Sequence, residues 1–408
     1  MNFNLKYGKQ EFEFDFPDRT EVLTVKEPEY TINKETFCKS FSDTLPSDQN
    51  RYKNIAVIVS DKTRLCGYPE FLPWITEILA KKGASKESIT FYIAYGTHAK
   101  QTEEESLNSY GGIYMNYRFV HHDSSDDSVF EIPGVTKRGT QVTIRKDILK
   151  SSLLITFGAI SHHYFAGYGG GRKLLFPGLA SRKAVYQNHG LFLDLKTRVL
   201  ATGCQPGMLK GNPLAEDLEE IDQYLPSKIS IHGILNNKGK VCQLTIGTGF
   251  KDFETACRIH DSYYRSAIHK QYDLVVASSG GYPKDINFIQ AHKSVHHAAA
   301  FVKDGGNLII SSECIDKIGS SYFLKYLEAG SFEAAFIILE KNYEGNGGTA
   351  LSMMTKTKRI RIHMRTSLND DLCRILNVTK VDEKGIQKII YNEKGTVALI
   401  ENASLLVP

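Results

Sequence analysis

The chain lacks the long apolar runs and paired cysteines that define several protein classes. None of its 408 residues falls in an apolar run long enough for a membrane helix, which needs about 18 such residues. The start of the chain also lacks the apolar core of a signal peptide. Its seven cysteines are scattered and form no C-x-x-C pair, which argues against a cysteine-bound zinc and is typical of a reducing compartment. We therefore expect a cytoplasmic protein with no membrane partner.

The common nucleotide and metal signatures are absent too. A phosphate loop starting at Gly167 would need its second glycine at Arg172, and Leu174 follows Lys173 where a hydroxyl is required. The dinucleotide pattern G-x-G-x-x-G fails at the same arginine, and no H-E-x-x-H segment occurs. These failures remove the sequence argument for ATP and count against a diffusible dinucleotide.

Charge and composition are those of an ordinary soluble globular protein. The net charge is +4, hydrophobic residues make up 41% and charged residues 24% of the chain, so nothing favours a nucleic-acid partner. A chain of 408 residues is too long for one ordinary core, and two domains are expected.

Short apolar runs alternate with segments of helical spacing, which predicts an α/β fold with largely parallel sheets flanked by helices. A β-hairpin is predicted at 5–16, and strands at 55–59, 89–94, 153–160, 229–235, 272–277, 307–310, 359–364 and 397–400. Helices are predicted at 69–82, 101–109, 181–189, from 212 onward, 250–270, 288–302, 322–328 and 332–341. We expect an N-terminal domain at 1–267 and a C-terminal domain at 268–408, with a last strand that could return to the first domain.

Polar clusters follow four of these strands, at 60–64, 95–98, 163–173 and 278–287. Ligands of open α/β sheets bind outside the carboxyl ends of the strands. Because the last cluster belongs to the second domain, the expected active site lies in an interdomain cleft. Each cluster alone also fits an ordinary turn or helix cap, so their coincidence at strand ends carries the expectation.

The third cluster combines a proton-transfer group, glycines and cations. His163 precedes a turn with Gly170 and Gly171, and Arg172 and Lys173 end it. Glycine lets the backbone approach a bound group closely, and the two cations indicate that this group is anionic. His162 adjoins His163 and competes with it for any role in proton transfer.

Taken together, these motifs resemble the nickel-dependent lactate racemase family over most of the chain. The resemblance is carried by Asp61-Lys62-Thr63-Arg64, Gly96-Thr97-His98, the segment 163–178, His189, and the segment 280–287 with Gln290 and Lys293. The ordered set at these spacings is specific, whereas each element alone is weak. The resemblance implies an isomerase that racemises or epimerises a small 2-hydroxy acid.

The family's cofactor is a nickel-pincer nucleotide, pyridinium-3,5-bisthiocarboxylic acid mononucleotide, which cofactor-synthesis proteins would supply. By position, the resemblance implies that Lys173 tethers it covalently and that His189 ligates nickel. The other cofactor-binding residues would be Asp61, Thr63, Arg64, Gly170, Gly171 and Arg172. His98 and His163 would be the two acid–base catalysts. Arg64, Gln290 and Lys293 would bind the substrate.

The chemistry of racemisation agrees with this set. The Cα–H bond of a 2-hydroxy acid is too weakly acidic for simple proton removal, so a hydride acceptor and a base for each face are needed. Two histidines can exchange acid and base roles near neutral pH, and a guanidinium can clamp the carboxylate. An imidazole with sulfur ligands suits square-planar nickel.

This chain departs from the family's pattern at two places. Ile289 stands where lactate-specific members often have an aromatic residue, and the segment 347–350 lacks an expected histidine. Both departures concern the substrate pocket and leave the 2-hydroxy acid open. Two other functions also stay open: an oxidoreductase with a diffusible nicotinamide-type cofactor, and a non-catalytic nickel- or nucleotide-binding protein.

Overall fold

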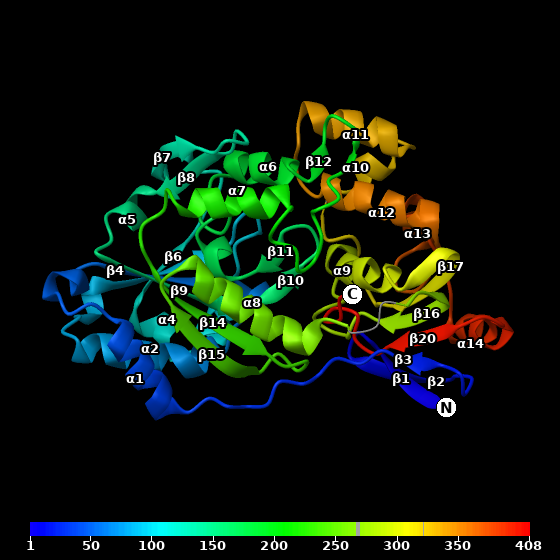
Figure 1. Cartoon of the computed structure of the whole chain (residues 1–408), viewed down its shortest axis with the longest axis horizontal. Helices are drawn as coiled ribbons and strands as arrows, with labels where there is room; N and C mark the ends of the chain where they lie inside the picture. Colours follow the sequence, from blue (N-terminus) through cyan, green and yellow to red (C-terminus); the bar gives the residue numbers. More distant parts are fainter. Residues whose placement is uncertain (267–269, 321) are drawn as a thin grey trace. The chain divides into compact units, whose positions relative to one another are not determined.

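The computed structural model describes residues 1–266, 270–320 and 322–408, and the chain divides into two compact units (Figure 1). The central unit comprises Glu27–Leu191 and Gly203–Tyr263. The terminal unit comprises Met1–Lys26, Phe192–Thr202 and Tyr264–Pro408. In the described part of the chain, no helix is long and apolar enough to cross a membrane.

The central unit is built on a six-stranded sheet in the order β15-β14-β9-β4-β5-β6. Its strands are β4 (Ile55–Ser60), β5 (Ile89–Ala94), β6 (Arg118–His121), β9 (Leu153–Ala159), β14 (Ile229–Leu235) and β15 (Val241–Gly247). All neighbours run parallel except β14 and β15, which are antiparallel. The parallel strands therefore end at one edge, as the strand-end clusters require.

Both faces of this sheet are covered, which explains why β4 is a continuous apolar run. Ile55, Val57 and Val59 pack against α1 (Lys34–Thr44) and α2 (Tyr68–Lys81), whereas Ala56 and Ile58 pack on the other face. The remaining helices of the unit are α3 (Glu103–Tyr110), α4 (Gly112–Asn116), α5 (Lys146–Leu149), α6 (Arg182–Gly190), α7 (Pro213–Asp222) and α8 (Phe250–Tyr264). Short hairpins β7 (Phe130–Val135) with β8 (Gln141–Arg145) and β10 (Ser161–His163) with β11 (Gly167–Gly169) complete it.

The terminal unit has a second six-stranded sheet, in the order β19-β18-β17-β16-β20-β3, with parallel neighbours throughout. Its strands are β3 (Glu21–Val22), β16 (Tyr272–Ser278), β17 (Val302–Ser311), β18 (Arg361–Arg365), β19 (Thr379–Lys380) and β20 (Val397–Ile400). Its helices are α9 (Phe288–Ala299), α10 (Leu324–Leu327), α11 (Phe332–Lys341), α12 (Gly347–Arg359), α13 (Asp370–Ile375) and α14 (Glu383–Asn392). Hairpins β1 (Asn2–Tyr7) with β2 (Gln10–Asp15) and β12 (Leu193–Asp194) with β13 (Val199–Leu200) are also part of the unit.

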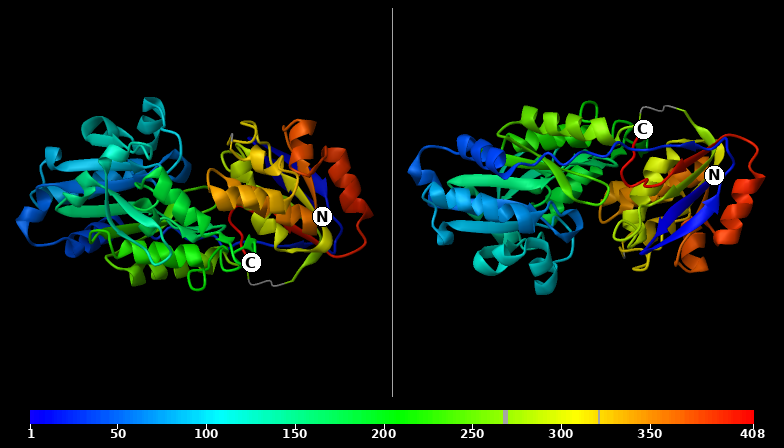
Figure 2. Two further views of the ribbon diagram at one scale, coloured as in Figure 1. Left: turned by 90° about the horizontal axis from the view of Figure 1, so that it is seen from above. Right: turned by 90° about the horizontal axis from the view of Figure 1, so that it is seen from below.

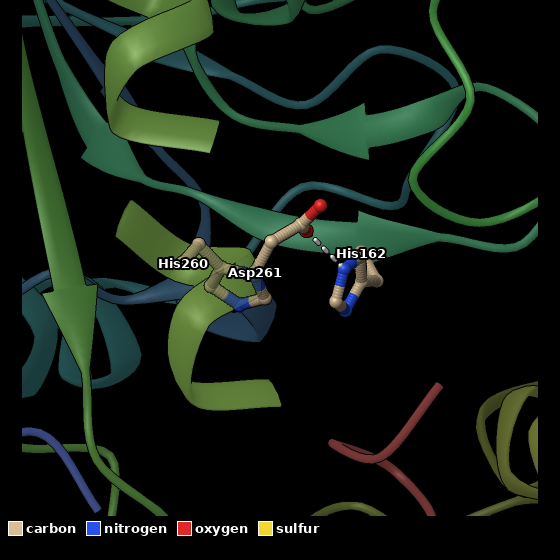
Figure 3. Close-up of side chains that lie close together, drawn as sticks. All are labelled: His162, His260 and Asp261. Atoms are coloured by element: carbon tan, nitrogen blue, oxygen red, sulfur yellow. Dashed lines mark hydrogen bonds and ion pairs between the residues drawn. The ribbon is translucent and has the colours of Figure 1, made fainter. Parts of the chain in front are cut away.

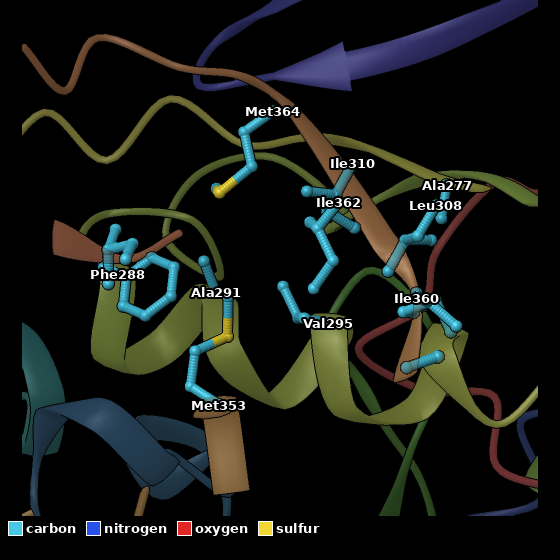
Figure 4. Packing of buried hydrophobic residues seen from close by; sticks show 14 of the residues in the cluster. Ala277, Phe288, Ala291, Val295, Leu308, Ile310, Met353, Ile360, Ile362 and Met364 are labelled. Atoms are coloured by element: carbon cyan, nitrogen blue, oxygen red, sulfur yellow. The ribbon is translucent and has the colours of Figure 1, made fainter. Parts of the chain in front are cut away.

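Different elements cover the two faces of the terminal sheet (Figure 2). On one face, Phe288, Ala291 and Val295 of α9 pack against Ile310 and other strand residues (Figure 4). On the other face, the β1–β2 hairpin and α14 pack on β16, β17 and β20. The N-terminal hairpin is therefore part of this unit's core.

The structure confirms the α/β class, the parallel sheets and most predicted elements. The two compact units are each made of separate segments of the chain, whereas the sequence predicted one boundary between residues 267 and 268. That boundary lies at 267–268, outside the described residues. The segments 1–26 and 192–202 belong to the terminal unit, because β3 pairs with β20 and Leu193 packs in the terminal core. The last strand, β20, lies beside β16 in that unit. Helix α8 ends at Tyr264 and α9 at Ala299, short of the predicted ends at 270 and 302.

Candidate active site

Charged and titratable side chains from several strand-end segments line one cavity in the central unit. The cavity is lined by Arg64 after β4, His98 after β5, His163 and Lys173 after β9, and His189 on α6. These are the residues that the sequence singled out as catalysts, tether, substrate clamp and metal ligand. They converge because β4, β5 and β9 are adjacent parallel strands.

Asp61 shapes the turn that follows β4. It begins a short 3₁₀ helix (Lys62–Arg64), and its Oδ1 accepts hydrogen bonds from the Thr63 backbone N at 2.8 Å and Thr63 Oγ1 at 2.5 Å. The Asp61 side chain is only 3% exposed, whereas Arg64 is exposed and lines the cavity. The turn thus buries the carboxylate and leaves the guanidinium facing the cavity.

The second oxygen of Asp61 holds His98. Asp61 Oδ2 lies 2.7 Å from His98 Nδ1. Burial alone would raise the pKa of Asp61, but the hydrogen bond and charge of His98, with smaller effects of Arg64 and Thr63, hold it well below its usual value. Because an ionised carboxylate only accepts hydrogen bonds, Nδ1 must donate. In neutral His98 the lone pair is therefore on Nε2.

His189 is held in the same tautomer by a different acceptor. Its Nδ1 lies 2.8 Å from the carbonyl oxygen of Val185, one turn earlier on α6, so Nδ1 donates and Nε2 keeps a lone pair. Burial, followed by the nearby charge of Lys173, lowers the pKa of His189 to about 3. A neutral, half-buried imidazole with a lone pair on Nε2 is the form that binds a transition metal.

His163 presents the opposite atom. Its Nδ1 accepts a hydrogen bond of 3.3 Å from the Ala166 backbone N, so the neutral ring carries its proton on Nε2. This hydrogen bond is long for an N–H donor. Protonating Nδ1 would therefore remove only a weak hydrogen bond. His98 and His163 thus differ at rest, one with a lone pair and one with an N–H at Nε2.

The glycine turn brings the main chain close to neighbouring backbone. Gly170 has φ of +76°, and a Cβ at this position would lie 2.1 Å from the carbonyl oxygen of Ala159. Gly171 has φ of +53°, and a Cβ there would lie 2.4 Å from the Phe253 ring. Only glycine fits both constraints, and the turn delivers Lys173 to the cavity.

The two cations of this turn have different surroundings. Lys173 lines the cavity, with Nζ 5.8 Å from the centre of the Phe165 ring. Arg172 is 5% exposed, and its guanidinium lies 5.1 Å and 5.3 Å from the ring centres of Phe250 and Phe253. Burial lowers its pKa to about 10. Its position among the rings of α8 differs from the anion contact that the sequence predicted.

His162 and His163 have different partners. His162 Nε2 lies 2.7 Å from Asp261 Oδ1 on α8, and the His162 side chain is 2% exposed. His163 lines the cavity. Neighbouring residues of a strand point to opposite faces, so the geometry favours His163 over His162 for proton transfer.

Gln290 and Lys293 lie on α9 of the terminal unit. Lys293 Nζ donates to Gln290 Oε1 at 2.6 Å. Helix α9 begins at Asn287, whose side chain accepts a hydrogen bond from the Gln290 backbone N. Their substrate contacts stay predictions.

Sequence reasoning gave no role to Phe165, whose ring has several neighbours among the site residues. Its ring centre lies 4.6 Å from that of His163 and 5.1 Å from that of His189. Together with Lys173 Nζ at 5.8 Å, the ring has the candidate base, metal ligand and tether as neighbours. An aromatic residue in a glycine-rich segment was the only available signal.

Comparisons with known proteins match the sequence and fold of this chain to one family. The Lactate racemase N-terminal domain matches residues 7–199, and the Lactate racemase C-terminal domain matches residues 268–344. The chain is 29% identical to the lactate racemase of Thermoanaerobacterium thermosaccharolyticum over 80% of this chain and 78% of that protein. It is 31% identical to the lactate racemase of Lactiplantibacillus plantarum over 71% of this chain and 68% of that protein.

Solved structures show the same fold as this chain. The lactate racemase apoprotein of T. thermosaccharolyticum superposes with a TM-score of 0.87 at 25% identity, covering 100% of this chain and 99% of that one. A Thermotoga maritima protein has the same fold, with a TM-score of 0.72 at 17% identity over 93% of this chain and 99% of that one. The chain therefore belongs to the lactate racemase family.

Proposed function

We propose that this protein racemises or epimerises a small 2-hydroxy acid by proton-coupled hydride transfer. The cofactor would be a nickel-pincer nucleotide attached through Lys173 and supplied by cofactor-synthesis proteins in the cytoplasm. The main support is the convergence of two imidazoles, a guanidinium and a lysine on one cavity in a chain whose relatives are named lactate racemase.

The residues present fit this cofactor. Nε2 of His189 has the lone pair that nickel requires, and burial keeps the imidazole neutral. Lys173 offers a primary amine at the cavity, beyond a glycine turn in which Gly170 has no space for a side chain. When bound, the group would supply a reversible acceptor for the Cα hydride.

The chain's own residues orient the substrate and move its hydroxyl proton. The exposed guanidinium of Arg64 would hold the carboxylate through two parallel hydrogen bonds, which fixes Cα relative to the acceptor. Nε2 of His98 would take the hydroxyl proton as the hydride leaves, and Asp61 would stabilise the resulting imidazolium.

His163 would serve the other enantiomer. To donate a proton from Nε2, the His163 ring must first be protonated on both nitrogens, and protonation of Nδ1 ends the long hydrogen bond from the Ala166 backbone N. Reduction then needs a proton on the keto oxygen, which His163 Nε2 would donate. In the reverse direction the two histidines exchange roles. Gln290 and Lys293 would contribute further substrate contacts.

The deciding experiment combines activity with peptide mapping. The protein is produced together with cofactor-synthesis enzymes and incubated separately with each enantiomer of several 2-hydroxy acids. We expect interconversion of at least one pair, one nickel per chain, and a mass adduct on the peptide containing Lys173. The Lys173→Ala variant should lose adduct and activity, whereas Lys183→Ala, which changes an exposed lysine of α6, should keep both.

Each alternative predicts a different result. An oxidoreductase with a diffusible nicotinamide-type cofactor would release keto acid in proportion to added cofactor and would carry no adduct. A binding protein would carry nickel or nucleotide without turning over any enantiomer. An unmodified Lys173 peptide in fully active enzyme would refute the covalent tether.

A further inference from the structure

A second group of metal-binding side chains lies on the face of the β10–β11 hairpin away from His163. His162 comes from β10, and His260 and Asp261 come from α8 (Figure 3). One ligand atom from each lies within 4.8 Å of the other two. None of these residues takes part in the proposed racemisation.

The two imidazoles of the group are buried, and Asp261 is partly exposed. The His162 side chain is 2% exposed and His260 is 4% exposed. The two imidazole rings are 4.5 Å apart, nearly perpendicular. His162 Nε2 lies 2.7 Å from Asp261 Oδ1, so the carboxylate faces one imidazole directly.

The other oxygen of Asp261 has its own partner. Tyr168 on β11 donates its hydroxyl to Asp261 Oδ2 at 2.7 Å. Tyr168 is paired directly with His162 across the hairpin, so both side chains extend from the same face toward α8. A ligating carboxylate typically has its second oxygen held by such an outer hydrogen bond.

Two imidazoles and one carboxylate form a donor set that binds Zn²⁺ and similar divalent ions. Ligand bonds of about 2.0–2.2 Å place the donor atoms of a tetrahedral site about 3.4 Å apart, a value between the 2.7 Å from His162 Nε2 to Asp261 Oδ1 and the 4.8 Å within which all three ligand atoms lie. Small rotations of the side chains would therefore close the site. With two neutral imidazoles and one carboxylate, a divalent ion keeps one positive charge, and the ligands found among the described residues leave a fourth position for water.

We propose that His162, His260 and Asp261 bind a divalent transition-metal ion of the zinc class. This ion is separate from the nickel assigned to His189. It would join β10 to α8 and so position the hairpin that carries His163. The three ligands are positioning residues rather than catalysts.

The test measures metal binding without any racemase assay. Metal-free protein carrying His189→Ala, which removes the other candidate ligand, is titrated with ZnCl₂ by calorimetry. Co²⁺ is then added as a spectroscopic probe. We expect one Zn²⁺ per chain and visible Co²⁺ absorption of a low-coordinate site. Tyr168→Phe should weaken binding on the order of 10-fold, because the carboxylate loses its outer hydrogen bond.

Two substitutions separate a metal site from a hydrogen-bond network. In His162→Gln, the side-chain amide can still donate to Asp261 but is a poor zinc ligand, so binding should fall at least about 100-fold while thermal unfolding changes little. His260→Gln should behave likewise. His363→Ala, which changes a histidine bonded to Asn307 in the terminal unit, should bind zinc normally.

Either of two results overturns the proposal. One is the absence of stoichiometric zinc binding in the His189→Ala protein. The other is unchanged zinc affinity in folded His162→Gln and His260→Gln, which would place the ion elsewhere. The outcome is independent of whether the protein racemises a hydroxy acid.

Discussion

The substitution Asp61→Asn tests whether one buried carboxylate sets the tautomer of His98. Asp61 Oδ2 faces His98 Nδ1 at 2.7 Å, while Oδ1 accepts two hydrogen bonds from Thr63. Asparagine can keep the Thr63 contacts through its oxygen and then turns its NH₂ group toward His98. An NH₂ donor favours a lone pair on Nδ1, which moves the imidazole proton to Nε2 and removes the base.

The expected loss follows from the role of that base. General acid–base catalysis contributes about 10²–10⁴-fold to a rate, and each tenfold corresponds to about 1.4 kcal/mol. We expect kcat of Asp61→Asn to fall within this range. KM should change less, because the proposed carboxylate clamp is Arg64 rather than Asp61.

The assay is the half-reaction of holoenzyme with each pure enantiomer, followed by cofactor absorbance. Hydride uptake should slow for the enantiomer served by His98. Asp126→Asn is a matched control, because Asp126 forms the same turn, accepting from Ser128 N at 3.1 Å and Ser128 Oγ at 2.5 Å, with no histidine partner among its hydrogen bonds in the described chain. Activity of Asp61→Asn within about threefold of the parent, a range well below that expected for loss of a base, would refute the reasoning.

The same substitution has a stability signature. The folded pKa of Asp61 is lower than that of an unfolded aspartate, near 3.9. Its stabilisation is therefore complete above about pH 4 and is lost as pH falls toward the folded pKa. We expect the free energy of unfolding, measured with urea between pH 3 and pH 6, to fall less steeply with acid in Asp61→Asn than in the parent. The difference in slope should be up to about 1.4 kcal/mol per pH unit.

Three further predictions address other residues. Arg64→Lys keeps the charge but loses the planar fork of the guanidinium. The decrease in kcat/KM should correspond to on the order of 2–4 kcal/mol of lost transition-state stabilisation. A near-normal kcat/KM would exclude Arg64 as the carboxylate clamp. His189→Ala should lose nickel by metal analysis while the organic cofactor stays on its tether; unchanged nickel would reject the assignment. Burial, followed by the charge of Arg359, lowers the pKa of Lys356 to about 7, so folding stability should rise from about pH 7 to the usual lysine pKa near 10.4. Lys356→Met should therefore raise the free energy of unfolding more at pH 7 than at pH 10. Lys358→Met, which changes an exposed lysine, should show no such difference between the two pH values.

The strands were predictable because they are buried on both faces. A continuous apolar run defines β4, and mostly apolar segments define β5, β9, β14 and β16. The clusters at the ends of the first three strands converge on one cavity. The link between Asp61 and His98 follows from the same logic, since β4 and β5 are parallel neighbours. The local apolar pattern and the parallel strand order were therefore sufficient to predict these strands and the meeting of their polar ends.

Other elements depend on contacts that a local pattern does not contain. Helix α12 begins with Gly347 and Gly348, which are poor helix formers. A Cβ on Gly347 would lie 2.1 Å from Leu339, and one on Gly348 would lie 2.6 Å from Phe192, so tertiary packing selects glycine there. The two-residue strand β3 is likewise defined by its partner, β20. By contrast, the amphipathic α14, with Ile386 and Ile390 buried one turn apart, was readable and was missed.

Side-chain direction explains the remaining differences at the site. Arg172 and Lys173 are adjacent cations in one short 3₁₀ helix, and their charge pattern predicts a common anionic partner. In a helical turn, adjacent residues point in different directions, so one reaches the cavity and the other the rings of α8. Charge pattern alone could not separate them.

The same argument applies to the histidine pair in β10, where the structure gives a clearer division. Strand alternation directs His162 toward Asp261 and leaves His163 at the cavity. Tyr168, opposite His162, also reaches Asp261, so one face of the hairpin is anchored to α8. A proton-transfer imidazole must be held to within a fraction of an ångström of its substrate, and a hairpin fixed on one face can present a histidine in this way on the other. The proposed metal ion would strengthen that anchor without entering the reaction, which explains how two adjacent histidines can have unrelated tasks.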